Sequence, residues 1–161
     1  PDPRLKLIAR PVEKVDDSVR RFIDDMYETM YNADGIGLAA TQVGDLRRIL
    51  VLDIAQKENR REPKVFINPE ISWLSEETNT YTEGCLSFPE HFADVVRPKK
   101  IKVKYLDYDG KQQEVEADEL LATCLQHEID HLNGKVFVDY IPPVKRDIIL
   151  RKLKKEKRND D

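Results

Sequence analysis

The chain has 161 residues, of which 40% are hydrophobic and 36% charged, as expected for one globular domain with a single core. Its formal net charge of −4 argues against a general nucleic-acid-binding protein. No apolar run is long enough to cross a bilayer, and we see no secretory signal. We therefore expect a cytoplasmic protein without a membrane partner, and a monomer, because nothing indicates an obligate interface.

The first predicted element is a helix over residues 16–33. Asp17 or Ser18 can cap its start, because both side chains accept hydrogen bonds from the unpaired backbone N–H groups of a first turn. Five apolar residues then recur at helical spacing and form one face: Val19, Phe22, Ile23, Met26 and Met30. The following segment, residues 35–42, begins with too many glycines for a stable helix.

Strands are predicted for much of the middle of the chain. Residues 48–55 and 63–68 have the composition of strands, and the polar residues 71–82 predict a strand with turns. Residues 100–108 alternate between apolar and lysine side chains over most of their length, which indicates a half-buried strand. Asp109-Gly110 then supplies a hairpin turn to a returning strand.

The last part of the chain is predicted to contain a helix, a short strand and a basic tail. The helix covers residues 118–132, with its first residue as the cap and Asn133-Gly134 as its stop. A strand over residues 135–140 follows. Residues 144–161 carry a local charge of +4, so the rest of the chain carries −8. We expect a core over residues 1–143 and a basic C-terminal helix of the same domain.

The second predicted helix contains the motif that indicates chemistry, His127-Glu128-Ile129-Asp130-His131. Side chains four residues apart lie on one helix face, with Cβ atoms about 5–6 Å apart, so two imidazoles can bind one metal ion. Glu128 can reach a water on that ion without being a ligand. The alternative is a surface helix with incidental histidines, which a chain with only three histidines would rarely produce by chance.

A catalytic metal site needs a third protein ligand and an open position for water. No histidine follows His131, and the soft candidates elsewhere are His91, Cys85 and Cys124. Cys124 shares the helix face but lies about 10 Å along the axis from His131, too far for one ion to bind both residues and His127. A thiolate presented by the irregular segment around Cys85 is geometrically easy, whereas His91 is more simply a surface residue.

Two other classes of protein are alternatives for a chain with this motif. A zinc peptidase that cleaves internal peptide bonds needs a downstream His or Glu ligand, and the only downstream glutamate is Glu156 in the basic tail. A structural zinc site needs four protein ligands, and only His91 is available as the fourth. Each alternative therefore lacks a convincing residue.

Three segments resemble, in order, the motifs of the peptide deformylase family. They are Gly35-Ile36-Gly37-Leu38-Ala39-Ala40-Thr41-Gln42, Glu83-Gly84-Cys85-Leu86-Ser87 and Gln126-His127-Glu128-Ile129-Asp130-His131. The resemblance extends over nearly the whole chain and is closest to the bacterial type with a C-terminal helix. It implies an α+β fold in which small antiparallel or mixed sheets surround a central helix that carries the H-E-x-x-H motif.

The resemblance also implies the activity, which is removal of the N-formyl group from the initiator methionine of newly made polypeptides, with release of formate. One divalent metal ion would be bound by Cys85, His127 and His131. Ferrous iron is expected natively, and Zn²⁺, Ni²⁺ or Co²⁺ could replace it. Glu83 and Arg97 would form an ion pair that supports the strand of Cys85.

Further roles follow from the same resemblance. Glu128 would transfer the proton, while the Gln42 amide and the Leu86 backbone N–H would stabilise charge on the formyl oxygen. The small Gly37 would let the formyl-methionyl nascent peptide pair beside this backbone as an added strand. The methionine side chain would lie in a pocket lined by Ile36, Leu120, Thr123 and Cys124. Residues 144–161 would dock on the ribosome near the exit of the nascent chain.

Overall fold

The computed structural model describes the backbone of residues 7–85, 88–135 and 150–151, and the side chains of these residues except 85 and 88–91. Its elements, in chain order, are α1 (Asp17–Asn32), β1 (Gly37–Ala39), the 3-10 helix η2 (Ala40–Val43), β2 (Ile49–Leu52), the 3-10 helix η3 (Ile54–Glu58), β3 (Lys64–Leu74), β4 (Thr78–Cys85), β5 (Phe88–Pro98), β6 (Lys100–Leu106), β7 (Gln112–Asp118) and α2 (Glu119–Leu132). None of the helices in this part of the chain is long and apolar enough to cross a membrane.

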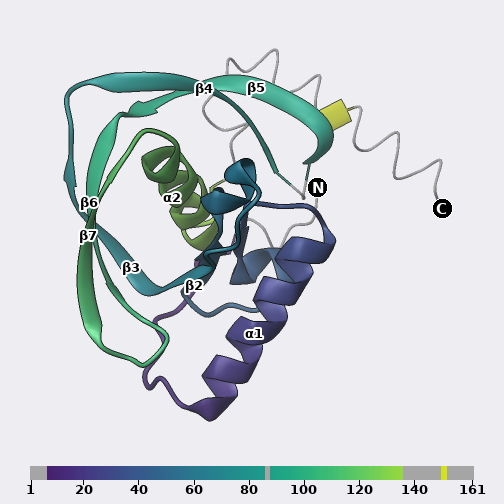
Figure 1. The fold of residues 1–161 in the computed structure, drawn as a ribbon, viewed down its shortest axis with the longest axis vertical. Coiled ribbons are helices and arrows are strands. Elements are labelled where there is room, and N and C mark those ends of the chain that lie inside the picture. Colours follow the sequence, from purple (N-terminus) through teal and green to yellow (C-terminus); the bar gives the residue numbers. More distant parts are fainter. Residues whose placement is uncertain (1–6, 86–87, 136–149, 152–161) are drawn as a thin grey trace.

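Two antiparallel sheets surround α2, which lies at the centre of the molecule (Figure 1). The larger sheet has the strand order β1-β2-β3-β6-β7, and β4 pairs with β5 in a separate hairpin. In Figure 1, β3, β6 and β7 curve past one side of α2, and the β4–β5 hairpin passes over another. This arrangement confirms the predicted α+β fold with a central helix.

The strand β2 divides the interior into two apolar clusters, because its successive side chains point to opposite faces. Leu50 and Leu52 belong to the cluster around α2, and Ile49 and Val51 to the cluster around α1. All four are almost completely buried. The two helices therefore pack on opposite faces of the same strand, and α2 is covered on several sides.

The predicted helix at residues 16–33 is present, but its cap is Asp16 rather than Asp17 or Ser18. The carboxylate of Asp16 accepts hydrogen bonds from the Val19 N–H at 3.0 Å and from the Ser18 hydroxyl at 2.8 Å. The observed helix, Asp17–Asn32, therefore lies within the predicted range, and only the cap residue was wrong. The predicted cap of the second helix, Asp118, is confirmed.

Several strand boundaries differ from those predicted. The strand expected over residues 48–55 ends at Leu52, because the Asp53 carboxylate accepts the Ala55 N–H at 3.1 Å and turns the chain into η3. The strand β5 was not predicted at all. Its buried positions include the charged Arg97, while its exposed face carries Phe92 and Val96, so the usual alternation of polar and apolar residues is obscured.

Parts of the C-terminal predictions lie outside the described residues. They are the strand over 135–140, most of the basic helix over 144–161, and the boundary between that helix and the core.

Candidate metal centre and substrate pocket

The H-E-x-x-H residues lie on the buried side of α2. His127, Glu128 and His131 are at most 7% exposed. The Nε2 atoms of the two histidines are 3.2 Å apart, with the rings edge to face, and Glu128 Oε1 lies 3.9 Å from His127 Nε2. The helical spacing predicted from the sequence therefore brings two ring nitrogens and one carboxylate to a common point.

The two histidines fit a single divalent metal ion. Nitrogen ligands about 2.0–2.1 Å from a tetrahedral ion lie about 3.3 Å apart, close to the observed separation of the Nε2 atoms. Glu83 Oε1 is 2.8 Å from His127 Nδ1, and a proton held between these two atoms would leave the lone pair of His127 Nε2 available to a metal ion. Glu128 Oε2 and His131 Nδ1 are buried without a hydrogen-bond partner among the described residues, as expected of a site completed by further groups.

A buried charge network supports His127 from behind. Arg97 donates from Nε to Glu83 Oε2 at 2.8 Å and from Nη2 to Glu83 Oε1 at 3.0 Å. Its Nη1 donates to Asp130 Oδ2 at 2.7 Å. The expected Glu83–Arg97 ion pair is confirmed. The links to His127 and Asp130 were not predicted, and they join β4, β5 and α2 around the metal centre.

The two buried glutamates of the site have opposite pKa shifts. Burial raises the pKa of Glu128 to about 7. Burial also acts to raise the pKa of Glu83, but hydrogen bonds from His127 and Arg97 outweigh it and the pKa falls below its usual range. Burial lowers the pKa of His131 to about 3, so its imidazole is neutral, the form that binds metals. Glu83 is thus a fixed charge, whereas Glu128 can exchange a proton near neutrality.

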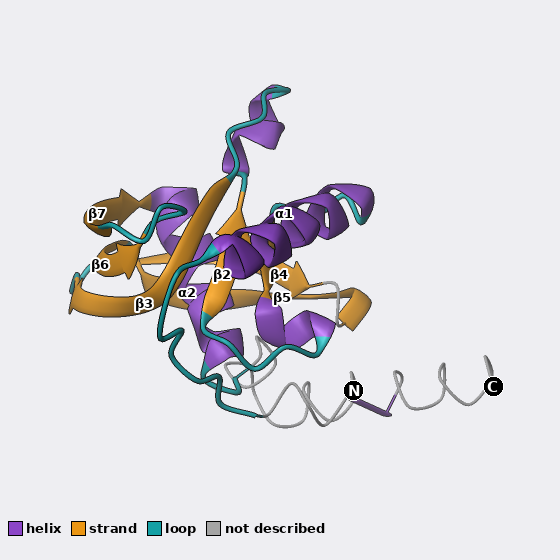
Figure 2. Ribbon diagram, turned by 90° about the horizontal axis from the view of Figure 1, so that it is seen from below, coloured by secondary structure: helices purple, strands orange, loops and turns teal. Residues whose placement is uncertain are grey.

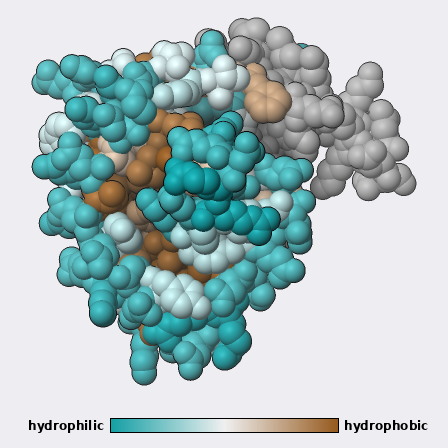
Figure 3. All heavy atoms as spheres, in the orientation of Figure 1, coloured by the Kyte–Doolittle hydropathy of each residue, from teal (hydrophilic) through white to brown (hydrophobic). Residues whose placement is uncertain are grey.

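A cavity of about 310 Å³ opens beside Glu128 and His127. All five residues predicted to bind substrate line it: Ile36, Gly37, Leu120, Thr123 and Cys124. Burial raises the pKa of the Cys124 thiol to about 12, so it lines the cavity as a small neutral group. On this face of the molecule, Figure 3 shows apolar residues in a hollow over α2 with hydrophilic residues around it.

Gly37 has a structural reason to lack a side chain. A Cβ atom there would lie 2.8 Å from Leu52 Cδ2 and 3.1 Å from Glu128 Oε1. A small residue was expected here because a substrate strand would approach the backbone closely. The structure adds that any larger residue would press on the carboxylate of the H-E-x-x-H motif.

The remaining predicted site residues come from two other segments. Gln42 lies in η2 and is half-buried, and its Oε1 accepts the Ala39 N–H at 2.9 Å. Cys85 is the last residue of β4, two positions after Glu83, but its side chain is outside the described residues, as is Leu86. The structure also places Lys57 and Tyr81 at the cavity, which no sequence motif indicated.

Comparison with known proteins agrees with this geometry. The family model described as polypeptide deformylase matches residues 1–147. The chain is 57% identical to a peptide deformylase of Bartonella henselae, over 96% of this chain and 88% of the relative. It is 56% identical to a peptide deformylase of Azotobacter vinelandii, over 98% of this chain and 93% of the relative.

Solved structures agree as well. A crystal structure of peptide deformylase from Ehrlichia chaffeensis superposes with a TM-score of 0.93 at 47% identity, covering 99% of this chain and 94% of that one. A complex of the enzyme from the same organism with actinonin also has a TM-score of 0.93, at 48% identity and 98% and 94% coverage. The chain therefore belongs to the polypeptide deformylase family and is a metal-dependent hydrolase that removes the N-formyl group from the initiator methionine of newly made polypeptides.

Proposed function

We propose that Cys85, His127 and His131 bind one divalent metal ion, Fe²⁺ in the cell and replaceable by Zn²⁺, Ni²⁺ or Co²⁺. The 3.2 Å separation of the two Nε2 atoms supports the histidine pair. The position of Cys85 at the end of β4, two residues after the glutamate that contacts His127, supports the third ligand. When bound, the ion supplies an acidified water and polarises the formyl carbonyl.

Glu128 is the proton-transfer group in this proposal. The observation that carries it is a buried carboxylate 3.9 Å from a proposed ligand atom, with Oε2 unpartnered among the described residues and a pKa raised to about 7 by burial. A group with this pKa takes a proton from the attacking water and returns it to the leaving amine near neutral pH.

Charge that develops on the formyl oxygen is stabilised by the Gln42 side-chain amide and the Leu86 backbone N–H. The Gln42 amide is oriented by its Oε1, which accepts the Ala39 N–H. The methionine side chain occupies the cavity lined by Ile36, Leu120, Thr123 and Cys124, and the peptide backbone pairs beside Gly37. A cavity of about 310 Å³ is at the small end of the usual range for ligand pockets, which suits one side chain.

Glu128→Ala tests the catalytic role. It is expected to retain stoichiometric metal but to lose about 10²–10⁴-fold in kcat for formate release from formyl-Met-Ala-Ser. Metal content and formate are measured on the same preparation. Near-full activity would exclude the proposed role of Glu128.

Cys85→Ser and Cys124→Ser form a matched pair for the ligand set. Loss of metal is expected only for Cys85→Ser, because a hydroxyl is a poor ligand at neutral pH. The opposite pattern would show that the wrong cysteine was chosen.

We also propose that residues 144–161 contact the ribosome. This segment carries a charge of +4, and basic side chains bind the phosphates of RNA with an affinity that falls with salt. The protein would then act as a monomer in the cytoplasm, where its substrate emerges. Removal of this segment should abolish co-sedimentation with ribosomes at low salt while formate release from a short peptide continues. Undiminished co-sedimentation would refute the contact.

A further inference from the structure

The cavity of about 310 Å³ proposed to bind the methionine side chain is called the methionine cavity. A second hollow of about 320 Å³ adjoins it and shares Lys57 and Leu120 with it. The segment between β2 and β3, which includes η3, forms much of its wall and projects from the body of the molecule in Figure 2. Lys57 belongs to η3 and lines both hollows, so it lies at the boundary between them. A side chain at this boundary can contact a substrate that extends beyond the methionine cavity.

The backbone that carries Lys57 is attached directly to the proposed peptide-binding segment. The Gln56 side-chain amide donates to the Gly35 carbonyl at 3.0 Å, and the Asp53 N–H donates to the Ile36 carbonyl at 2.8 Å. Asp53 is 1% exposed, so this attachment lies in the interior. The backbone next to Lys57 is therefore attached to the segment beside which the substrate is proposed to pair.

Lys57 is the only lysine or arginine among the described residues that line the methionine cavity. Its side chain is exposed and makes no ion pair with any other residue in the described part of the chain. Arg60, by contrast, is paired with both Glu58 and Glu62 on the wall of the second hollow. The charge of Lys57 also reaches the methionine cavity, where it opposes the rise in the pKa of Cys124 caused by burial.

The geometry of an extended peptide connects the two hollows. Alternate side chains of a strand lie on the same side, about 6.5–7 Å apart for residues two positions apart. With the methionine side chain in the first cavity, the side chain of the third substrate residue falls on the same side, toward the adjoining hollow. Lys57 lines both hollows, so its ammonium group would be within reach of that third side chain.

We propose that Lys57 is a specificity-determining residue that favours an acidic side chain at the third position of the formylated substrate. This inference rests on the proposed binding of methionine in the first cavity. A carboxylate is the complementary group for an ammonium at such a boundary, and a basic side chain there would be repelled.

Three C-terminally amidated peptides test the proposal: formyl-Met-Ala-Asp, formyl-Met-Ala-Asn and formyl-Met-Ala-Lys. At low salt, the wild-type kcat/KM for the Asp peptide is expected to exceed that for the Lys peptide by about fivefold, with Asn between them. Lys57→Glu should reverse this order, and Lys57→Gln should bring the ratio close to one. The preference should shrink at about 0.5 M salt, because the charges are exposed.

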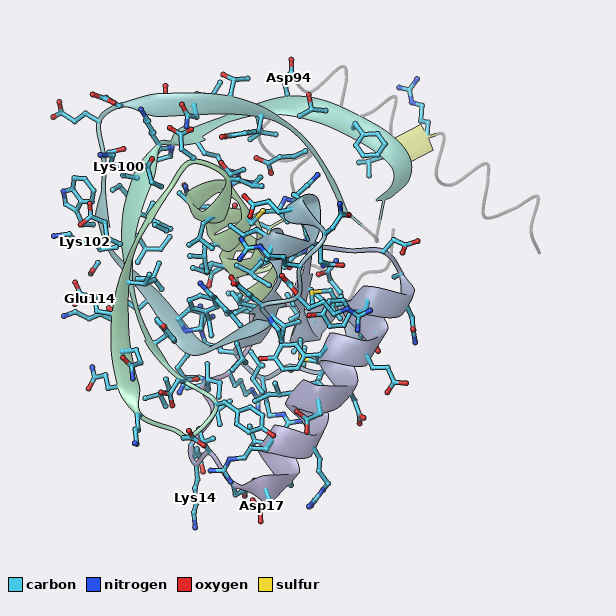
Figure 4. All side chains as sticks on the ribbon, viewed as in Figure 1. Lys14, Asp17, Asp94, Lys100, Lys102 and Glu114 are labelled. Carbon is cyan, nitrogen blue, oxygen red and sulfur yellow. The ribbon has the colours of Figure 1, made fainter. Side chains whose placement is uncertain are left out.

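Lys14→Glu is the matched control, since it makes the same change in net charge. Figure 4 shows Lys14 at the far end of α1, away from α2. This variant should keep the wild-type order of the three peptides. Equal Asp-to-Lys ratios in wild type and Lys57→Glu would overturn the inference, as would a preference that follows the second residue in formyl-Met-Asp-Ala-amide. Failure of wild type to release formate from any peptide would instead contradict the proposed function.

Discussion

The helices α1 and α2 differ in the kinds of side chain that they bury. α1 buries only apolar side chains, Val19, Ile23, Met26 and Met30, against the sheet. α2 also buries apolar residues, but it brings His127, Glu128 and His131 into the interior with them. α1 also donates hydrogen bonds from Arg20 Nε to the Tyr108 carbonyl and from the Tyr31 hydroxyl to Asp53, but its fully buried side chains are all apolar. The second also buries polar groups: His127 contacts Glu83 of β4, whereas Glu128 Oε2 and His131 Nδ1 have no hydrogen-bond partner among the described residues.

The polar partners make the α2 region more sensitive to single substitutions. A buried ion pair contributes little compared with a well-packed apolar pair, but removing one of its members leaves an uncompensated charge in the interior. Glu83, Arg97 and His127 are all buried and joined by hydrogen bonds of 2.8–3.0 Å. The difference between the helices is therefore testable by removing one group from each environment.

The largest effect is expected for Arg97→Met, which has a similar length but no charge. It leaves the carboxylates of Glu83 and Asp130 without their shared counter-charge, so the free energy of unfolding should fall by about 3–5 kcal/mol. Because Glu83 orients His127, metal affinity should also fall by about 10–100-fold. Urea unfolding of the metal-free protein and metal titration measure the two effects. Unchanged metal affinity would show that the charge network does not influence metal binding.

The corresponding substitution in the apolar region is Ile23→Ala. Ile23 is 0% exposed on α1, and loss of its side chain should lower the free energy of unfolding by about 3 kcal/mol. The kcat and the metal content of the folded protein should stay at wild-type levels, because α1 contributes no residue to the site. A loss of metal comparable to that of Arg97→Met would show that the two regions are not independent.

The sequence predicted local features of both helices and few of the contacts between elements. The apolar face of α1 and the convergence of His127 and His131 follow from residues three or four apart on one helix. The contacts of Glu83 with His127 and of Arg97 with Asp130 join residues from separate strands and a helix. Such pairs depend on how β4 and β5 pass over α2. The strand β5 was missed because the charged Arg97 is buried beside Ala93 and Val95 while the apolar Phe92 and Val96 are exposed.

The position of Lys57 was unpredictable for the same reason. A single lysine in a charged segment has no distinguishing spacing, and its place at the cavity results from the turn at Asp53 and the attachment of η3 to Gly35. The ligands and the proton-transfer group of the site could be proposed from motifs. The residues around its entrance required the tertiary structure.

The first turns of the two helices also differ, and this gives the smallest predicted effect. Asp16 and Asp118, the residues before α1 and α2, both have an extended backbone, but Glu119, the first residue of α2, has φ +52, in the left-handed region that favours glycine. No residue of α1 has a positive φ. The Glu119 carboxylate accepts hydrogen bonds from Asn79 at 3.0 Å and from Tyr81 at 3.1 Å. Exposed contacts of this kind contribute little, so they do not offset all of the backbone strain.

Comparison of Glu119→Gly with Glu119→Ala isolates that strain, because both substitutions remove the same side-chain contacts. At an ordinary helical position, a variant with alanine has a free energy of unfolding about 1 kcal/mol higher than a variant with glycine. At Glu119 the order should be reversed, with glycine more stable by about 1 kcal/mol, since only glycine adopts a positive φ without steric cost. Thermal and urea unfolding of the two variants measure the difference. If alanine proved the more stable, α2 would begin with an unstrained turn like α1, and the contrast between the two helices would be confined to their buried faces.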